Sequence, residues 1–338
     1  MKALVITEPG SYGVAVVADP APESGQVVVA PRAVGVCGTD LHILDGEFPP
    51  APYPLVPGHE FAGEVVELGA GVADLRVGDR VAVDPSLFCG HCVYCRRGRG
   101  NLCQNWGAIG DTVDGAFAEY VAVPAANAYR IPDSLSWTSA ALVEPLSCVV
   151  HGLRRLGMPA GSDLLIVGGG TIGLLLLQTA VRSGAATVSV IDPEPARCAL
   201  ALKWGASAAA ATLAELMAER EFGFEFSIEA TGVPAAAQSA VSGLSRGGTM
   251  LVFGVAPPEA TLPLSQFTVY NDEITVLGSM AVLNSFEPAL SLMASGAIAG
   301  DEMVTHRFAL DDFVGAVDAV RDRRGLKVQV GTDATSGR

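Results

Sequence analysis

Four cysteines in one short segment constrain this chain more than any other feature of its sequence. They are Cys89, Cys92, Cys95 and Cys103, in CGHCVYCRRGRGNLC. Three thiolates at steps of three, with a fourth eight residues later, can enclose one metal ion in a tetrahedral cage, and Zn²⁺ is the usual occupant of an all-sulfur site. Because four protein ligands leave no coordination position open for a substrate, the segment predicts a structural zinc lobe over residues 86–106.

Two other uses of clustered cysteines fit this sequence less well. The chain has seven cysteines, an odd number, and no visible secretory signal, which disfavours a set of disulfides. An iron–sulfur cluster is harder to exclude, but the spacing matches neither of the ferredoxin-type runs. Zinc is therefore the favoured ligand of the four thiolates.

The composition limits the class of protein and its partners. At 338 residues the chain is long enough for two domains, and 50% hydrophobic against 17% charged residues indicates a globular protein with large buried sheets. The formal net charge of −15 disfavours nucleic acid as a partner. No membrane span is visible either. We therefore expect a cytoplasmic protein, in a reducing environment that keeps thiols available for metal.

The order of strand and helix patterns predicts an α/β protein with one domain inserted into another. The first part of the chain reads as short strands bounded by Gly, Pro and Asp, such as VVVAPRAVGVCG and FAGEVVELG. From about Ser162, apolar strands alternate with helices, which indicates a doubly wound parallel sheet. We expect residues 1–150 and 280–338 to form the β-rich domain and residues 151–279 to form the parallel-sheet domain.

A glycine-rich turn in the second domain predicts a dinucleotide site. Strand 164–167 runs into GGGTIG, which fits G-x-G-x-x-G and leads into a helix. In this motif the glycines allow a tight turn, close approach of the pyrophosphate, and close helix–strand packing, while the helix N-terminus attracts phosphate. The candidate residues of this turn are Gly168, Gly170, Thr171, Ile172 and Gly173.

The next strand carries the residue that selects between the two nicotinamide dinucleotides. Asp192 ends that strand, at the interval expected of an acid that binds the adenosine ribose and repels a 2′-phosphate. An alternative role for Asp192 is to cap the following helix. Arg197 lies nearby and could accommodate a 2′-phosphate. The pattern favours NAD over NADP.

Two further motifs, together with the features above, resemble the medium-chain, zinc-dependent alcohol dehydrogenase family. Cys37 lies in VGVCGTDLH, and His59 lies in PGHEFAGEV with Glu60 beside it. The cysteine lobe, EPLSCVVHGLRR, the glycine motif and VTHRF follow in order, so the resemblance covers nearly the whole chain. It implies a GroES-like catalytic domain and a Rossmann domain, with two zinc ions per chain, one catalytic and one structural.

The resemblance implies a second, catalytic zinc. Cys37 and His59 match its first two ligands, and Glu144 in ALVEPLSC takes the place of the third, as in the sorbitol and polyol dehydrogenase branch. Glu60 can approach the metal or stay outside its ligand sphere. Cys148 lies out of register and is expected to pack. One thiolate, one neutral imidazole and one carboxylate balance Zn²⁺ and leave a position open for an alcohol.

The same resemblance implies a reaction and the residues around it. The zinc acidifies an alcohol, whose hydride passes to NAD⁺ to give a ketone or aldehyde and NADH. Thr39 and His42 match a proton relay to solvent. Further positions match segments that line the cofactor, namely Thr231, Phe253, Gly254, Val255 and Ser279. The expected partner is a small-molecule alcohol.

The substrate and the oligomeric state are less constrained. Ile43 stands where sorbitol-oxidising relatives commonly have a tyrosine, and Met280-Ala281 stands where they have a cationic residue. A polyol or sugar alcohol remains the first expectation, with a cyclitol, a vicinal diol or a simple secondary alcohol as alternatives. The strands from TMLVFGVA through EITVLGSM could continue a sheet across a two-fold axis, which predicts a tetramer or a dimer.

Two other classes of function remain as alternatives. One is a zinc-free reductase of activated C=C bonds on the same fold, and the other is a non-catalytic NAD-binding module in which both zinc ions hold structure. Cys37, His59 and Glu144 argue against the reductase. The open coordination position that three ligands imply argues against the module.

Overall fold

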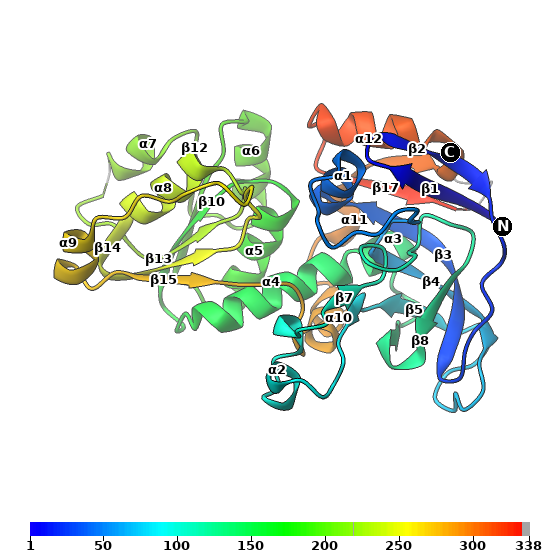
Figure 1. The fold of residues 1–338 in the computed structure, drawn as a ribbon. Helices are drawn as coiled ribbons and strands as arrows, with labels where there is room; N and C mark the ends of the chain where they lie inside the picture. Colours follow the sequence, from blue (N-terminus) through cyan, green and yellow to red (C-terminus); the bar gives the residue numbers. More distant parts are fainter. Residues whose placement is uncertain (219, 333–338) are drawn as a thin grey trace. The chain divides into compact units, whose positions relative to one another are not determined.

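The chain forms two compact units, each described separately below. The computed structural model describes residues 1–218 and 220–332. The first unit comprises Met1–Ser147 and Val282–Arg338, of which 333–338 lie outside the described residues, and the second comprises Cys148–Ala281. Two separate stretches of sequence therefore build the first unit, and the stretch between them builds the second (Figure 1).

A seven-stranded sheet is the framework of the first unit. Its strand order is β16-β17-β3-β4-β5-β9, and β8 also pairs with β3. All of its pairings are antiparallel except β16 with β17. The pairs β1–β2 and β6–β7 form two small additional sheets. The C-terminal strand β17 pairs directly with β3, so the two separate stretches of sequence share one sheet.

The strands of the first unit are β1 (Lys2–Glu8), β2 (Ser11–Val16), β3 (Gln26–Val36), β4 (Glu60–Leu68), β5 (Arg80–Val83), β6 (Ser86–Leu87), β7 (Gly107–Ala108), β8 (Val121–Pro124), β9 (Ala128–Arg130), β16 (Val304–Ala309) and β17 (Lys327–Gly331). Its helices and 3₁₀ turns are α1 (Gly38–Asp45), α2 (Val93–Arg96), η1 (Gly100–Leu102), η2 (Ala125–Asn127), α3 (Trp137–Ala141), α10 (Phe286–Ala294), α11 (Gly300–Met303), η3 (Leu310–Asp312) and α12 (Phe313–Arg321). Helix α4 (Val143–Leu156) begins in the first unit and ends in the second.

The core of the first unit explains why these residues form strands. Strand β3 is rich in valine, a β-branched residue that suits an extended backbone, and Val27, Val29 and Val34 are completely buried. Phe117 and Phe313 pack edge to face in the same core, with ring centroids 4.8 Å apart. This core fixes the register of β3 and β4, on whose ends the candidate metal ligands lie.

The second unit is a parallel six-stranded sheet in the order β12-β11-β10-β13-β14-β15. Numbered within this unit the order is 3-2-1-4-5-6, the doubly wound arrangement in which dinucleotides bind where the order reverses, beside the first strand. Helices α5 and α6 pack on β10, β11 and β12, while α8 packs on β10, β13 and β14. The carboxyl ends of β10 and β13 therefore flank the reversal point.

The strands of the second unit are β10 (Asp163–Val167), β11 (Thr187–Ile191), β12 (Ala208–Ala210), β13 (Phe224–Glu229), β14 (Leu244–Val252) and β15 (Thr275–Gly278). Its helices are α5 (Thr171–Arg182), α6 (Pro195–Lys203), α7 (Leu213–Met217), α8 (Pro234–Ser242) and α9 (Gln266–Asn271). The predicted fold class, a β-rich domain together with a doubly wound parallel-sheet domain, is confirmed.

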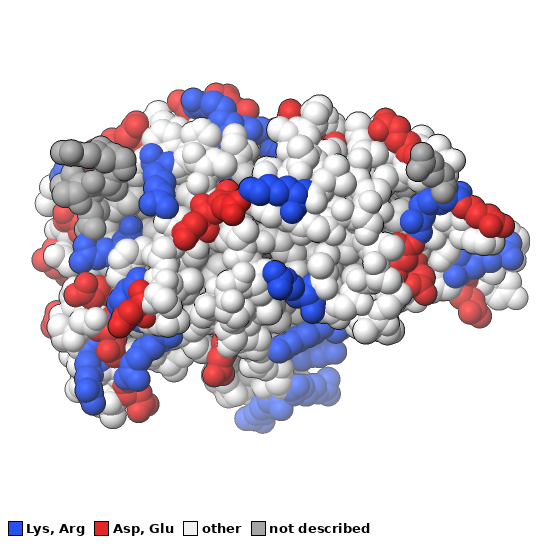
Figure 2. Space-filling model, turned by 180° about the vertical axis from the view of Figure 1, so that it is seen from behind, with Lys and Arg blue, Asp and Glu red and all other residues white. Residues whose placement is uncertain are grey.

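The last two features of the fold are the distribution of surface charge and the length and polarity of the helices. On the face drawn in Figure 2, acidic and basic side chains are interspersed. Within residues 1–218 and 220–332, every helix is too short or too polar to cross a membrane.

Candidate metal centres and cofactor site

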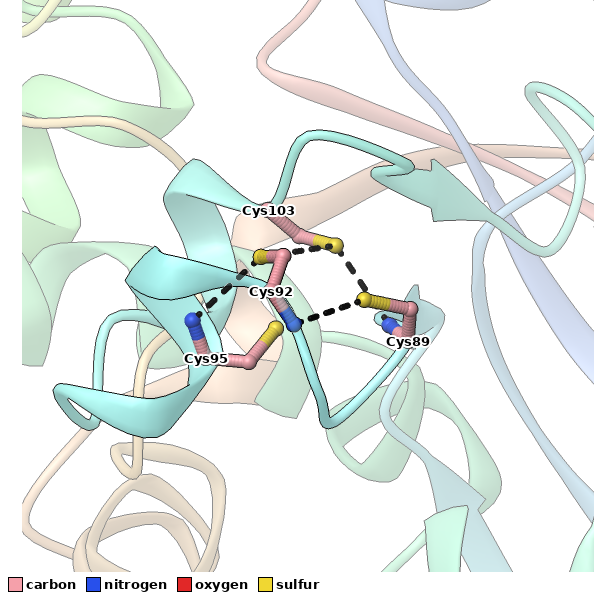
Figure 3. A group of neighbouring side chains, drawn as sticks. All are labelled: Cys89, Cys92, Cys95 and Cys103. Atoms are coloured by element: carbon pink, nitrogen blue, oxygen red, sulfur yellow. Dashed lines mark hydrogen bonds between the residues drawn. The ribbon is translucent and has the colours of Figure 1, made fainter.

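The four cysteines of the lobe converge on one point. Their sulfur atoms all lie within 4.8 Å of one another, and Figure 3 shows the four side chains turned toward a common centre. The Sγ atoms of Cys92 and Cys103 are 3.9 Å apart. Two ligands at about 2.3 Å from a tetrahedral zinc would be separated by roughly 3.8 Å. The geometry therefore fits a four-sulfur zinc site.

The backbone of the lobe stabilises negative charge on these sulfurs. The Cys92 N–H points to the sulfur of Cys89 at 3.4 Å, and the Asn105 N–H points to that of Cys103 at 3.2 Å. Backbone N–H groups, first that of Cys95, lower the pKa of Cys92 to about 6. Burial and the neighbouring sulfurs raise the pKa of Cys95 to about 12. Without a cation, the four neighbouring sulfurs cannot all carry a negative charge at neutral pH. A divalent cation would allow all four groups to be thiolates together.

A second group of metal-binding atoms lies at the ends of two paired strands. Cys37 follows β3 directly and caps α1, while His59 and Glu60 stand at the start of β4. The antiparallel register pairs Gly35 with Glu60, so the end of β3 meets the start of β4. One ligand atom each from Cys37, His59 and Glu60 lies within 4.8 Å of the others. Thiolate, imidazole and carboxylate are a donor set that suits zinc and leave a position open.

Glu60 is held by a buried cation that the sequence did not reveal. Its carboxylate forms an ion pair with Lys327, which opens β17, and both side chains are almost completely buried. Burial alone would lower the pKa of Lys327, but the charges of Glu60 and Cys37 outweigh it and raise this pKa. Gly35 makes the room, because a Cβ at this position would collide with the Glu60 carboxylate. Lys327 thus offsets the charge that Glu60 brings to the centre.

Two further carboxylates face the imidazole of His59. Its Nδ1 lies 2.9 Å from an oxygen of Asp111 and 3.6 Å from one of Asp40. Burial alone would lower the pKa of His59, yet Asp111 and Asp40 raise it well above its usual value. For the Asp40 carboxyl the effect of burial is the opposite one, and it raises the pKa of this group to about 6. With Nδ1 facing these carboxylates, Nε2 is the ring nitrogen left to bind a metal.

The other residues predicted for this centre lie outside the group of three metal-binding atoms. Glu144 is buried in the first turn of α4, but it does not belong to the group formed by Cys37, His59 and Glu60. Thr39 places its hydroxyl 3.8 Å from the sulfur of Cys37. His42 is partly exposed, and its Nδ1 contacts Glu47 at 2.8 Å. Of the two candidate carboxylates, Glu60 is therefore the one that the structure groups with Cys37 and His59.

The glycine motif forms a backbone cradle at the reversal point of the second sheet. Gly168 follows β10 with φ at +110°, a conformation that favours glycine. A Cβ on Gly173 would collide with the carbonyl oxygen of Gly168, whereas a Cβ on Gly170 would meet nothing within 4 Å. Gly173 thus serves packing, and Gly170 leaves open space before α5, which begins at Thr171 and Ile172. The cradle fits a pyrophosphate.

These two glycines give a paired prediction. We expect Gly173→Ala to lower both the melting temperature and the affinity for NADH, because the backbone carbonyl of Gly168 cannot move away cheaply; overpacking of this kind costs about 1–3 kcal/mol. Gly170→Ala should weaken NADH binding without changing the melting temperature. Calorimetric melting and fluorescence titration with NADH measure the two effects. Equal melting temperatures for both variants would contradict the packing role of Gly173.

The acid expected at the ribose position is buried next to the cradle. Asp192 accepts the N–H groups of Gly169 at 2.8 Å and Glu194 at 2.9 Å, and Arg197 lies 3.5 Å from its carboxylate. Glu194, not Asp192, caps α6, so the alternative role of Asp192 as that helix cap is not realised. Asp192 instead fixes the glycine turn to the end of β11.

The remaining predicted cofactor segments surround a buried acid that the sequence analysis missed. Glu229, at the end of β13, accepts the N–H groups of Thr231 at 2.5 Å and Gly232 at 2.8 Å. Gly254 packs so closely on the Gly232 N–H that a Cβ there would collide with it. Three other predicted residues continue this edge, namely Phe253 against Gly152, the exposed Val255, and Ser279 after β15. An acid ending an apolar strand, FSIEATG, was the available signal.

Comparison with known proteins gives matches along nearly the whole chain. Residues 23–133 match the alcohol dehydrogenase GroES-like domain, and residues 171–295 match the zinc-binding dehydrogenase domain. D-arabinitol dehydrogenase 1 of Uromyces fabae is 36% identical over 98% of this chain and 97% of its own length. L-threonine 3-dehydrogenase of Shewanella loihica is 33% identical over 98% of this chain and 100% of its own length.

A solved structure agrees with these matches. A zinc-binding dehydrogenase from Sinorhizobium meliloti, bound to NADP, superposes with a TM-score of 0.93 at 37% identity, covering 98% of both chains. The fold, the domain matches and the full-length relatives thus indicate the same family as the two cysteine-containing centres and the glycine cradle. The chain belongs to the medium-chain, zinc-dependent alcohol dehydrogenase family.

Proposed function

We propose that this protein is a zinc-dependent dehydrogenase that oxidises a secondary alcohol, of the polyol or sugar-alcohol class, with NAD⁺. The observation that carries the proposal is the group of Cys37, His59 and Glu60, which offers a metal three different donors within 4.8 Å of one another. A bound zinc would supply a Lewis acid that lowers the pKa of an alcohol. The centre argues against a C=C reductase, which needs no such ligands.

The residues of the chain divide the remaining work. Cys37, His59 and Glu60 would hold the metal, and Lys327 offsets the negative charge that Glu60 brings to the centre. Thr39, whose hydroxyl lies 3.8 Å from the sulfur of Cys37, relays the alcohol proton, because its hydroxyl oxygen accepts that proton and gives up its own. His42, partly exposed and in contact with Glu47, delivers that proton to solvent. The cysteine lobe binds the second, structural zinc.

A matched pair of variants identifies the carboxylate that binds the catalytic metal. We expect Glu60→Gln to weaken metal retention by about ten- to a hundredfold, because it replaces an anionic oxygen donor by a neutral one and leaves Lys327 buried without its counter-charge. Glu144→Gln is the control, and it should act only on turnover if Glu144 contacts the alcohol or water instead of the metal. Zinc content after dialysis against a chelator measures the effect. A larger loss in Glu144→Gln would restore Glu144 as the third ligand.

The cofactor preference follows from the charge of Asp192. We propose NAD, because a buried carboxylate beside the cradle repels a 2′-phosphate, although the Sinorhizobium relative binds NADP. We expect Asp192→Ser to lower kcat/KM with NAD⁺ by roughly ten- to a hundredfold, the equivalent of about 1.5–3 kcal/mol for hydrogen bonds to a charged group. Glu194→Gln, a neighbouring carboxylate, is the control. A wild-type protein that prefers NADP⁺ would contradict the proposal.

The substrate class is tested by a panel. The similarity to D-arabinitol dehydrogenase supports a polyol, while the similarity to L-threonine 3-dehydrogenase makes an amino alcohol the second candidate. NADH formation would be followed with D-arabinitol, sorbitol, a cyclitol, 2,3-butanediol, L-threonine and 2-propanol. Preference for one polyhydroxy compound supports the proposal. Preference for L-threonine would contradict the polyol class and assign an amino alcohol as the substrate. Turnover of none of them would favour a non-catalytic NAD-binding module.

The second unit offers a surface for a second copy of the chain. Strand β15 is the edge of the parallel sheet, and the neighbouring helix α9 exposes two large aromatic residues, Phe267 at 71% and Tyr270 at 83%. Pairing of this edge would bury the aromatic residues and extend the sheet across a two-fold axis. We propose a dimer built on this edge, and a tetramer by further contacts, which sedimentation measurements can distinguish.

The seven cysteines, none in a disulfide, suit a reducing cytoplasm.

A further inference from the structure

We propose that Asp111 is a positioning residue that orients the imidazole of His59 for metal binding. The inference rests on the proposed function, since it concerns the centre that Cys37 and His59 form. Asp111 belongs to none of the motifs that point to that centre. Its place in the fold, on the loop between β7 and β8, brings it there.

The geometry distinguishes Asp111 from the other carboxylate beside the ring. An oxygen of Asp111 lies 2.9 Å from Nδ1 of His59, within hydrogen-bonding distance, whereas that of Asp40 lies at 3.6 Å. The second oxygen of Asp40 already accepts the Cys37 N–H at 2.8 Å and so caps α1. Asp40 is therefore committed to the helix, and Asp111 is the closer acceptor for the ring.

The atoms involved are buried and incompletely satisfied. His59 and Asp111 are each only 6% exposed. Nδ1 of His59 and the facing oxygen of Asp111 have no well-aligned hydrogen-bond partner among the described residues, a rare condition for buried polar atoms. A small rotation of the ring would aim an Nδ1–H group at Asp111. The neutral ring has a single N–H, so this contact leaves the lone pair of Nε2 free for a metal.

The backbone holds the Asp111 loop firmly against the segment that carries His59. The N–H groups of Gly115 and Ala116 donate to the carbonyls of Val56 and Gly58, at 2.7 and 2.9 Å. A Cβ on either Gly110 or Gly115 would collide with the backbone of Gly58, so the two segments lie in direct backbone contact. The position of the Asp111 carboxylate is therefore built into the fold instead of being left to a mobile side chain.

The test compares three variants of this loop. Asp111→Ala removes the acceptor, and we expect it to weaken Co²⁺ or Zn²⁺ binding at the Cys37–His59 centre by ten- to a hundredfold, the usual effect of losing a partner of a metal-binding histidine. Asp111→Asn keeps an oxygen of similar size and should retain most of the affinity. Asp114→Ala is the matched control, because Asp114 binds the Val56 N–H at 2.9 Å and does not face the ring.

Two readouts separate positioning from general destabilisation. Absorption of the Co²⁺-substituted protein reports metal binding, and ¹⁵N NMR of His59 in the metal-free protein reports which ring nitrogen carries the proton. Loss of the Nδ1 proton signal in Asp111→Ala but not in Asp114→Ala supports the proposal. Unchanged affinity and tautomer in Asp111→Ala, or an equal loss of affinity in Asp114→Ala, would overturn it. A wild-type protein that binds no metal at Cys37 and His59 would overturn the proposed function itself.

Discussion

Replacing Cys37 by serine is expected to lower kcat/KM for alcohol oxidation by about a thousandfold, since Lewis-acid catalysis supplies several kcal/mol and each 1.36 kcal/mol is a factor of ten. A serine hydroxyl does not ionise at neutral pH and so cannot replace the thiolate that helps to balance the charge of the metal. NADH formation measures the loss, and metal analysis should show about one zinc fewer per chain.

The matched control for this variant is Cys148→Ser. Cys148 lies on α4, near Glu144 in sequence, and is not one of the cysteines grouped in either centre. We expect this variant to retain both zinc ions and its turnover, and NADH affinity should be unchanged in both variants because the glycine cradle is untouched. If Cys148→Ser lost the metal while Cys37→Ser kept it, the assignment of the centre to the end of β3 would be wrong.

Replacing Cys95 by serine is expected to remove the other zinc and to unfold the cysteine lobe. Structural zinc contributes about 10–16 kcal/mol of apparent binding free energy in small domains, and the described lobe contains only short elements, α2, η1 and the pair β6–β7, to hold it otherwise. Loss of even a few kcal/mol would lower the melting temperature by about 10 °C. Calorimetry, zinc analysis and limited proteolysis within residues 86–106 measure the change.

Cys198→Ser is the control for the lobe. Cys198 lies on α6, where its thiol contacts the carbonyl of Asp192 at 3.2 Å, a hydrogen bond that serine can also form. We expect this variant to keep its zinc and its melting temperature within a few degrees. A Cys95→Ser protein with full stability and an intact lobe would show that the four sulfurs do not hold a structural metal.

The parts of the molecule that could be predicted from sequence are those whose chemistry lies within a few consecutive residues. Cys89, Cys92 and Cys95 are spaced so that a short loop must bring their sulfurs together if it folds at all. The turn from Gly168 to Gly173 is equally local, because strand, turn and helix follow one another without interruption. In both cases the residue spacing itself restricts the backbone to few conformations.

The placement of Glu60, the carboxylate that we propose as a metal ligand, does not follow from local sequence. Family resemblance pointed to Glu144, while charge balance argued against adding Glu60. The fold changes that balance, because β17 pairs beside β3 and places Lys327 against Glu60. A lysine within the strand LKVQV was the available signal, but nothing in the sequence tells which acid a buried lysine will meet.

By itself, then, the sequence determined the two-domain class, the cysteine lobe, the glycine cradle and the family, all of which depend on local spacing and on the order of motifs. Only the tertiary structure decided that Lys327 neutralises Glu60 and that Asp111 faces His59. These contacts join residues far apart in the chain, and strand register and backbone contact bring them together. Inside a buried, weakly screened site such contacts govern charge and protonation, so the electrostatics of the centre belong to the fold.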